Sequence, residues 1–370
     1  MQAFKLFRKY DLIIITTTAL LVAIGLLVLY SSGIKPSQVN LQLDTSRQFL
    51  YVAVGLVLLG LFARMDYRIL RNYAVPLYFI TLGMLLVVNF FGAQRLGATR
   101  WITIGFFQFQ PSELAKLVLI IVLAKFFAMN YEKTRQLRYI FISSLYVLPL
   151  LALLLLQPDL ATASVLGAIW LVMTIATRVR KQWLVLGAVL AIIAVPLSLP
   201  FLHGYQRQRI ETFLNPTANP TTTGYNVNQA IIAVGSGGWF GQGLGAGSQS
   251  QGNFLPSQHT DFIFAVLAEK LGFVGGVLVI LLFAVLLTRS VMVVRKSRDR
   301  FGSFLVIGVI AMLLFHLFIN IGMNLGLVPV AGIPLPFISA GGSSMLVSLI
   351  GIGVIESVAI RRRKAEINLD

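Results

Sequence analysis

The chain has 370 residues, of which 57% are hydrophobic and only 12% are charged, and its mean hydropathy is +0.84. Soluble globular domains are about half apolar and about a quarter charged, so this composition excludes an ordinary soluble domain and predicts a polytopic membrane protein. The absence of cysteine excludes disulfides, cysteine-ligated metals and thiol nucleophiles.

The apolar stretches are long enough to cross a bilayer, since about 20 apolar residues span a hydrocarbon core of about 30 Å. We therefore expect an all-α polytopic integral membrane protein, a single domain over residues 1–370 with about ten transmembrane helices. The first stretch is too long for a cleavable signal peptide and is expected to remain as a helix. The ten stretches are 11–32, 48–64, 73–91, 112–129, 139–156, 159–177, 183–202, 261–288, 303–327 and 337–360.

The net charge of +17 is a topology signal. If the N-terminus lies in the cytoplasm, the inner segments hold 22 of the 30 Lys and Arg residues and the outer segments hold six. This bias predicts that both termini are cytoplasmic. It also argues against nucleic acid as a partner, which a soluble chain of this charge would suggest.

Two outer connections are longer than ordinary loops. Residues 92–111 carry Arg95, Arg100 and Trp101. Residues 203–260, between the seventh and eighth helices, lack the charge density of a disordered linker. Their glycine-rich run, Gly235–Gly247, matches no nucleotide-binding pattern. We expect this long loop to lie ordered across the outer face of the bundle.

Ionisable groups in or beside apolar runs are candidates for function, because their burial is unfavourable. Asp11 and Glu356 lie near cytoplasmic helix ends and are expected to be solvated. The four acidic residues that fall toward the outer side are Glu113, Asp159, Asp261 and Glu269.

Asp261 lies where the long loop joins an apolar helix. On a straight helix it would stand about 12 Å further out than Glu269, at the mouth of a cavity that water and a lipid headgroup can reach. One interpretation is a residue that merely caps the helix. The other is a functional carboxylate with His259 and Thr260 beside it.

Glu113 and Lys116 are three residues apart on one helical face, after a helix start at Pro111. They are either a stabilising ion pair or a functional pair that positions the loop holding Trp101. Lys270 is expected to reach the membrane interface or to pair with Glu113 or Asp159. The ninth helix carries three polar side chains, His316, Asn320 and Asn324. We expect them to pack or to form hydrogen bonds between helices, and not to contact substrate.

Four arginines lie on the side where topology disfavours basic residues: Arg95, Arg100, Arg207 and Arg209. They are either solvated at the surface or they capture a pyrophosphate headgroup, which guanidinium groups bind in a bidentate manner.

Five segments, in chain order, resemble the SEDS family (shape, elongation, division and sporulation): Phe109–Lys116, Gln157–Leu160, Tyr205–Arg209, His259–Glu269 and Pro334–Ser343. The resemblance runs from the first helix to the tenth and is closest to the elongation branch. It implies a peptidoglycan glycosyltransferase in the cytoplasmic (inner) membrane that polymerises lipid II on the outer face. The implied partners are a class B penicillin-binding protein and other membrane proteins of the elongation complex.

The resemblance also implies site residues. The catalytic group is Asp261, Glu113 and Lys116, with Asp261 as the essential loop carboxylate. Residues expected to contact substrate are Trp101, Arg100, Arg207, Arg209, His259, Thr260 and Glu269. The chain departs from the family's pattern at Ala161, Lys270 and Ala340, where Gly, Glu and Tyr are frequent.

The chemistry expected of this site is attack of a sugar hydroxyl on an anomeric carbon while undecaprenyl pyrophosphate leaves. Asp261 would act as general base, and arginines would hold the pyrophosphate. A divalent cation, Mg²⁺ or Mn²⁺, with Asp261 as a ligand is the alternative role. Two other functions stay open: a lipid II flippase, and a non-catalytic scaffold that activates a penicillin-binding protein.

Overall fold

The structure, a computed structural model, describes residues 10–33, 40–91, 93–95, 98–104, 107–187, 189, 204–214, 223–252, 254–255 and 257–367. The expected span 183–202 lies largely outside these residues, as do the side chains of Arg95 and Arg100.

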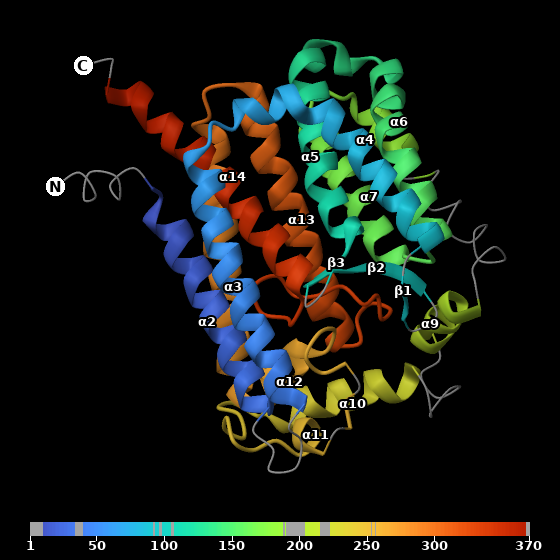
Figure 1. The fold of residues 1–370 in the computed structure, drawn as a ribbon, viewed down its shortest axis with the longest axis vertical. Coiled ribbons are helices and arrows are strands. Elements are labelled where there is room, and N and C mark those ends of the chain that lie inside the picture. The colour runs from blue at the N-terminus through green and yellow to red at the C-terminus, as the bar shows by residue number, and fades with distance from the viewer. Residues whose placement is uncertain are drawn as a thin grey trace.

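Long apolar helices form a bundle, which confirms the expected all-α polytopic architecture (Figure 1). By length and hydropathy, seven of the described helices are candidates to cross a membrane. They are α2 (Leu12–Gly33), α3 (Asn40–Arg64), α4 (Arg68–Phe91), α6 (Leu137–Leu156), α12 (Ile263–Arg295), α13 (Arg300–Asn324) and α14 (Gly342–Ile367).

Two further predicted spans are occupied by helices of weaker membrane character. The helix α5 (Pro111–Asn130) carries Glu113, Lys116 and Lys125, and α7 (Leu160–Ile175) has only 16 residues. Both have a defined start, α5 through a proline in its first turn and α7 through the Asp159 side chain, which accepts from the Thr162 amide. The 3-10 helix η1 (Tyr131–Arg135) joins α5 to α6.

The bundle core lies around α14 and α13. In α14, 83% of the membrane-spanning window is buried inside the protein, against 22% in α6. The outer surface of α6 is therefore left for lipid, whereas α14 is enclosed by other helices. Its polar Ser357 hydroxyl is satisfied by the Met65 carbonyl and the Tyr67 amide, as a buried hydroxyl requires.

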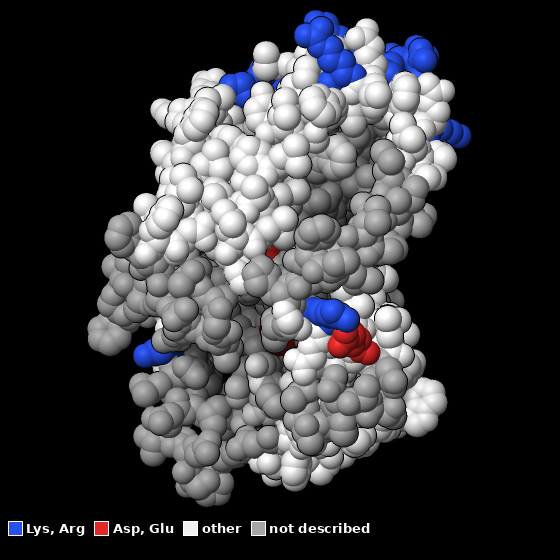
Figure 2. Space-filling model, turned by 90° about the vertical axis from the view of Figure 1, so that its right-hand side faces the viewer, with Lys and Arg blue, Asp and Glu red and all other residues white. Residues whose placement is uncertain are grey.

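One end of the bundle collects the irregular structure. The short helices α9 (Gly204–Leu214), α10 (Thr223–Ser236) and α11 (Ser248–Gln251) lie in the lower half of Figure 1, away from the end of α14. Figure 2 shows Lys and Arg side chains concentrated at the opposite, upper end, where α5 is joined to α6. This charge asymmetry is what the positive-inside rule describes. We call the end of the bundle that holds α9, α10 and α11 the loop end, and the opposite end the basic end.

A small antiparallel sheet, which the sequence did not predict, precedes α5. Its strands are β1 (Ala93–Arg95), β2 (Ala98–Ile104) and β3 (Phe107–Phe109), in the order β1-β2-β3. It is anchored to the bundle through β3, because the Gln108 amide donates to the Tyr51 hydroxyl at 3.2 Å and the Gln108 carbonyl accepts from Ser343 at 3.1 Å.

The helix α12 is broken at Gly272, whose φ of 68° and ψ of −167° are not helical. The glycine-rich loop completes the break. The amides of Phe273 and Val274 donate to the Gly238 and Trp239 carbonyls, and the Glu269 and Lys270 carbonyls accept from residues 242 and 243. Backbone groups freed inside a bundle need such partners. The loop between the seventh and eighth predicted helices is thus ordered in its described parts. Its backbone forms hydrogen bonds with α12 on both sides of the break.

Candidate functional site

Asp261 sits in a tight turn just before α12. The Ser257 carbonyl accepts from the amides of both Thr260 and Asp261 at 3.1 Å, and Ser257 itself has a φ of 53°. The N-cap of α12 is Phe262, whose side chain makes no capping hydrogen bond, and the first-turn amide of Ala265 donates to Asn324 of α13. The carboxylate of Asp261 therefore does not cap α12. This excludes the interpretation of Asp261 as a residue that merely caps the helix.

The turn is held at the last turns of α13. The side-chain amides of Asn320 and Asn324 each donate to the Asp261 carbonyl at 3.0 Å, and the Asn324 oxygen accepts from the Ala265 amide. Both asparagines are buried and bond between helices, as expected from the sequence. These bonds place Asp261 at the end of α13, and the break of α12 at Gly272 follows both Asp261 and Glu269 in the chain.

Arg209 faces Asp261 across Gly332. A Cβ atom placed on Gly332 would lie 3.6 Å from Oδ2 of Asp261 and 3.8 Å from both terminal nitrogens of Arg209. With a φ of 75°, this position favours glycine. A larger residue would occupy the space between the carboxylate and the guanidinium.

Electrostatics at Asp261 work in two directions. Burial raises the pKa of its carboxyl above the ordinary value, and the charge of Arg209 and the Thr260 hydroxyl partly oppose this rise. A carboxylate whose pKa is raised by a partly dry environment, yet which keeps a cation opposite, is suited to accepting a proton.

The two arginines of α9 have different surroundings. Nη1 of Arg209 donates to the Ala331 carbonyl at 3.0 Å and is directed to the site. Arg207 pairs with Glu211 at 2.7 Å, with side chains 64% and 52% exposed, on another face of α9. Of these two expected pyrophosphate contacts, the geometry places only Arg209 beside Asp261.

Glu113 and Lys116 form a buried ion pair. The Lys116 nitrogen lies 2.7 Å from Oε1 of Glu113, and it donates to Nε2 of His316 at 3.1 Å. Oε2 of Glu113 is buried and has no hydrogen-bond partner among the described residues. The pair predicted from the i, i+3 spacing thus exists, and it reaches across to α13.

Glu269 and Lys270 of α12 form hydrogen bonds with the long loop. Oε1 and Oε2 of Glu269 accept from the amides of Gln249 and Ser250, at 2.8 and 3.1 Å. This engagement favours a structural role for Glu269 over the substrate contact that the sequence predicts. Lys270 donates to the Leu244 carbonyl and is 1% exposed, so the expectation that it reaches the interface was wrong.

The remaining predicted contacts surround the Asp261 turn or the sheet. The carbonyls of His259 and Thr260 accept from Ala340 and Ser339, so this turn is bonded to the segment before α14. Trp101 lies partly buried in β2. The side chain of Arg100 is outside the described residues.

A metal ion would find few protein ligands here. Within the described ranges, no three His, Asp or Glu side chains come together to hold a cation. Asp261 offers a single carboxylate, which fits a Mg²⁺ ion that takes its other ligands from water and substrate phosphates. A fully protein-ligated site is not built from these residues.

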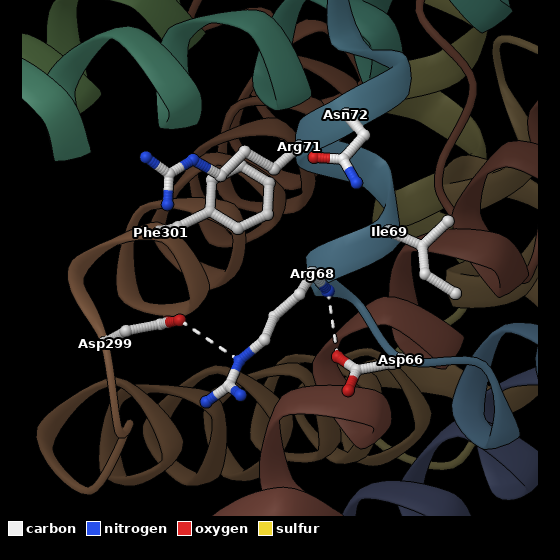
Figure 3. A pocket seen from close by; sticks show the side chains of 7 residues that line it. All are labelled: Asp66, Arg68, Ile69, Arg71, Asn72, Asp299 and Phe301. Carbon is white, nitrogen blue, oxygen red and sulfur yellow. Dashed lines mark hydrogen bonds and ion pairs between the residues drawn. The ribbon is translucent and has the colours of Figure 1, made fainter.

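Two cavities lie at opposite ends of the bundle. A small cavity of about 70 Å³ lies beside Arg209, between α9, α10 and the segment after α13. A larger one, about 670 Å³, lies at the basic end, and its lining side chains are drawn in Figure 3. Its walls are Asp66, Arg68, Ile69, Arg71, Asn72, Asp299 and Phe301.

Sequence reasoning missed the segment from Ala331 to Pro334. Its carbonyls accept from Arg209, Asn320 and His316. The available signal was the spacing of His316, Asn320 and Asn324, which repeats every four residues and marks one polar face on an otherwise apolar helix.

Comparison with known proteins covers nearly the whole chain. The family model described as "Cell cycle protein", for FtsW, RodA and SpoVE, matches residues 11–364. The probable peptidoglycan glycosyltransferase FtsW of Geobacter sp. (strain M18) is 36% identical over 364 residues, which are 96% of this chain and 98% of that protein.

Two solved structures resemble the fold. A chain of a peptidoglycan synthase complex, described as coordinating polymerization and crosslinking, is 32% identical with a TM-score of 0.82, over 95% of this chain and 98% of that one. The rod shape determining protein RodA of Thermus thermophilus is 29% identical with a TM-score of 0.69, over 95% and 97%. By sequence and by fold, the chain belongs to the FtsW/RodA/SpoVE family, the SEDS family.

Proposed function

We propose that this protein is a peptidoglycan glycosyltransferase of the elongation type that polymerises lipid II at the outer face of the cytoplasmic membrane. The observation that carries the proposal is the Asp261 carboxylate, uncommitted to helix capping and facing Arg209 at the loop end. A relative named as a probable peptidoglycan glycosyltransferase matches 96% of the chain.

The reaction needs one base and one site for negative charge. The acceptor's sugar hydroxyl attacks the anomeric carbon of the donor, and the new C–O bond forms as the bond to pyrophosphate breaks. Asp261 takes the hydroxyl proton. Arg209 stabilises the charge that grows on the leaving undecaprenyl pyrophosphate, which then departs with both electrons of the broken bond.

The preorganisation of this pair supports the proposal. Asp261 is held through its backbone by Asn320 and Asn324, and Arg209 through its bond to the Ala331 carbonyl. A site held by a rigid scaffold reacts without reorganising its dipoles. The Glu113–Lys116 pair supports this scaffold from inside the bundle.

Membrane orientation and partner follow from the same family. The concentration of Lys and Arg at the basic end supports a cytoplasmic location for that end, which turns Asp261 outward (Figure 2). A related chain works in a complex that polymerises and crosslinks peptidoglycan. The partner proposed here is a class B penicillin-binding protein, which supplies the crosslinking.

A divalent cation would give Asp261 its alternative role, as a metal ligand in place of the general base. Asp261 would supply one ligand to Mg²⁺ or Mn²⁺, with pyrophosphate and water as the others. The ion would neutralise the leaving group in addition to Arg209.

The test is a gel assay of lipid II polymerisation by the purified protein with its penicillin-binding protein, whose own polymerase activity, if any, is blocked. Wild type should yield glycan ladders, and Asp261→Asn should lose about 10²–10⁴-fold in rate while retaining its thermal unfolding midpoint. Each is run with Mg²⁺, Mn²⁺ or chelator.

Ladders of normal intensity from Asp261→Asn would remove this residue from the chemistry. No ladder from wild type would instead favour the flippase or scaffold functions, which lipid II translocation in vesicles separates.

A further inference from the structure

His316 is a buried histidine on α13 with a partner at each ring nitrogen. Nε2 lies 3.1 Å from the Lys116 nitrogen, and Nδ1 lies 3.1 Å from the Pro334 carbonyl. A lysine ammonium can only donate, so Nε2 accepts. The carbonyl can only accept, so Nδ1 carries the proton. The two partners together fix one neutral tautomer and one ring orientation.

The segment Ala331–Pro334 receives bonds from two elements. Arg209 of α9 donates to the Ala331 carbonyl at 3.0 Å, and Asn320 of α13 donates to the Ile333 carbonyl at 2.8 Å. His316 completes the row at Pro334. We call this segment the carbonyl strap.

The strap joins the buried ion pair to the reacting groups. On one side, the Lys116 nitrogen bonds to both His316 and Glu113. The side chains of Lys116 and Glu113 are 2% and 6% exposed. On the other side, the Ala331 carbonyl of the strap accepts from Arg209, and Gly332 of the strap lies beside both Arg209 and Asp261. Loss of the bond at Pro334 would release the strap beside the guanidinium.

We propose that His316 is a positioning residue, which fixes Arg209 opposite Asp261 by tying the carbonyl strap to α13 through Pro334, while Lys116 of the buried ion pair orients the ring. It touches neither substrate nor the reacting atoms. This inference deepens the proposed function and rests on it.

Two substitutions separate the two nitrogens of the ring. His316→Asn keeps an N–H near the position of Nδ1 and can still donate to Pro334. His316→Phe keeps the ring volume and loses both bonds. Because displacement of a positioned group by about 1 Å can lower a rate by about 10²-fold, His316→Phe should lower kcat by about that factor with KM for lipid II within about twofold. His316→Asn should recover most of kcat.

A double-mutant cycle tests the route of the effect. If His316 acts through Arg209, His316→Phe should add little loss in a background of Arg209→Ala, since the group it positions is already gone. Full additivity of the two losses would overturn the inference. Equal kcat loss in His316→Asn and His316→Phe, matched by equal loss of folded protein, would reduce His316 to a packing residue.

A measurement independent of activity separates this inference from the proposed function. The chain has no cysteine, so Ala331→Cys introduces a unique thiol on the strap. Its maleimide labelling rate should rise in His316→Phe and stay near that of the parent in His316→Asn. Equal rates in all three proteins would sink the positioning role even where polymerisation is observed. A raised rate in a protein that makes no glycan would uphold the strap and overturn the proposed function instead.

Discussion

The two ends of the bundle bury charge in different ways. At the basic end, Asp11 is 2% exposed, and both of its carboxylate oxygens accept from Nε of Arg289 at 3.0 Å. Its amide in turn donates to Glu356. At the loop end, Asp261 faces a guanidinium across a glycine, and Oε2 of Glu113 is buried without a described donor.

This difference separates structural from chemical charge. A buried carboxylate that is fully engaged by a cation has no capacity left for a reactant. One that keeps an oxygen open, beside a cation held by other bonds, can exchange a proton. The comparison predicts that charges fully engaged by partners act on stability at either end, and that a carboxylate with an open oxygen, such as Asp261, acts on the reaction.

The largest expected effect on stability comes from Lys116→Met. It leaves the Glu113 carboxylate buried without its cation, and breaking a buried pair in this way costs about 3–5 kcal/mol of unfolding free energy. Thermal unfolding in detergent measures it. Adding Glu113→Gln should restore part of the loss, and a double variant no more stable than Lys116→Met would contradict the pairing.

A smaller loss is expected for Glu269→Gln. The amide can accept from only one of the two backbone N–H groups now bound, and an unsatisfied buried donor costs about 1–3 kcal/mol. The unfolding midpoint should fall while kcat per folded molecule is retained. A loss of kcat at unchanged stability would return Glu269 to the reaction site.

Arg209→Ala should move the pH dependence of polymerisation. Arg209 holds down a pKa that burial raises, so its removal raises the pKa of Asp261 further. Because the ionised carboxylate is the base, activity is lost as pH falls through this pKa, and the acid limb of the pH–rate profile should shift to higher pH. Arg207→Ala is the matched control, since its exposed pair with Glu211 should leave the acid limb in place. A shift of equal size in both variants would contradict the assignment of Arg209.

Much of the fold could be predicted from the sequence, because span length and hydropathy are local properties. The start of α5 at Pro111 and the Glu113–Lys116 pair followed from helical spacing. The strands β1 and β3 could not be predicted, since three residues carry too short a pattern. The break at Gly272 was missed because the loop that completes it is more than 25 residues away in sequence.

The site was predicted less completely, because its partners are tertiary. Asp11 and Glu356 were expected to be solvated, and this was wrong: their place near helix ends does not show that Arg289 pairs with Asp11 or that Glu356 accepts from the Asp11 amide. Arg207 and Arg209 are two residues apart and indistinguishable until α9 places them on different faces. The carbonyl strap has no side-chain signature of its own, since it acts through backbone oxygens, and only the polar face of α13 that bonds to it is visible in the sequence.

The most direct test pairs one acid from each end. Asp261→Asn and Asp11→Asn are the same isosteric change, and lipid II polymerisation and unfolding midpoint would be measured on both proteins. The account predicts that Asp261→Asn loses polymerisation at an unchanged midpoint, and that Asp11→Asn unfolds at lower temperature while each folded molecule polymerises normally. Polymerisation by Asp261→Asn at the wild-type rate would contradict it.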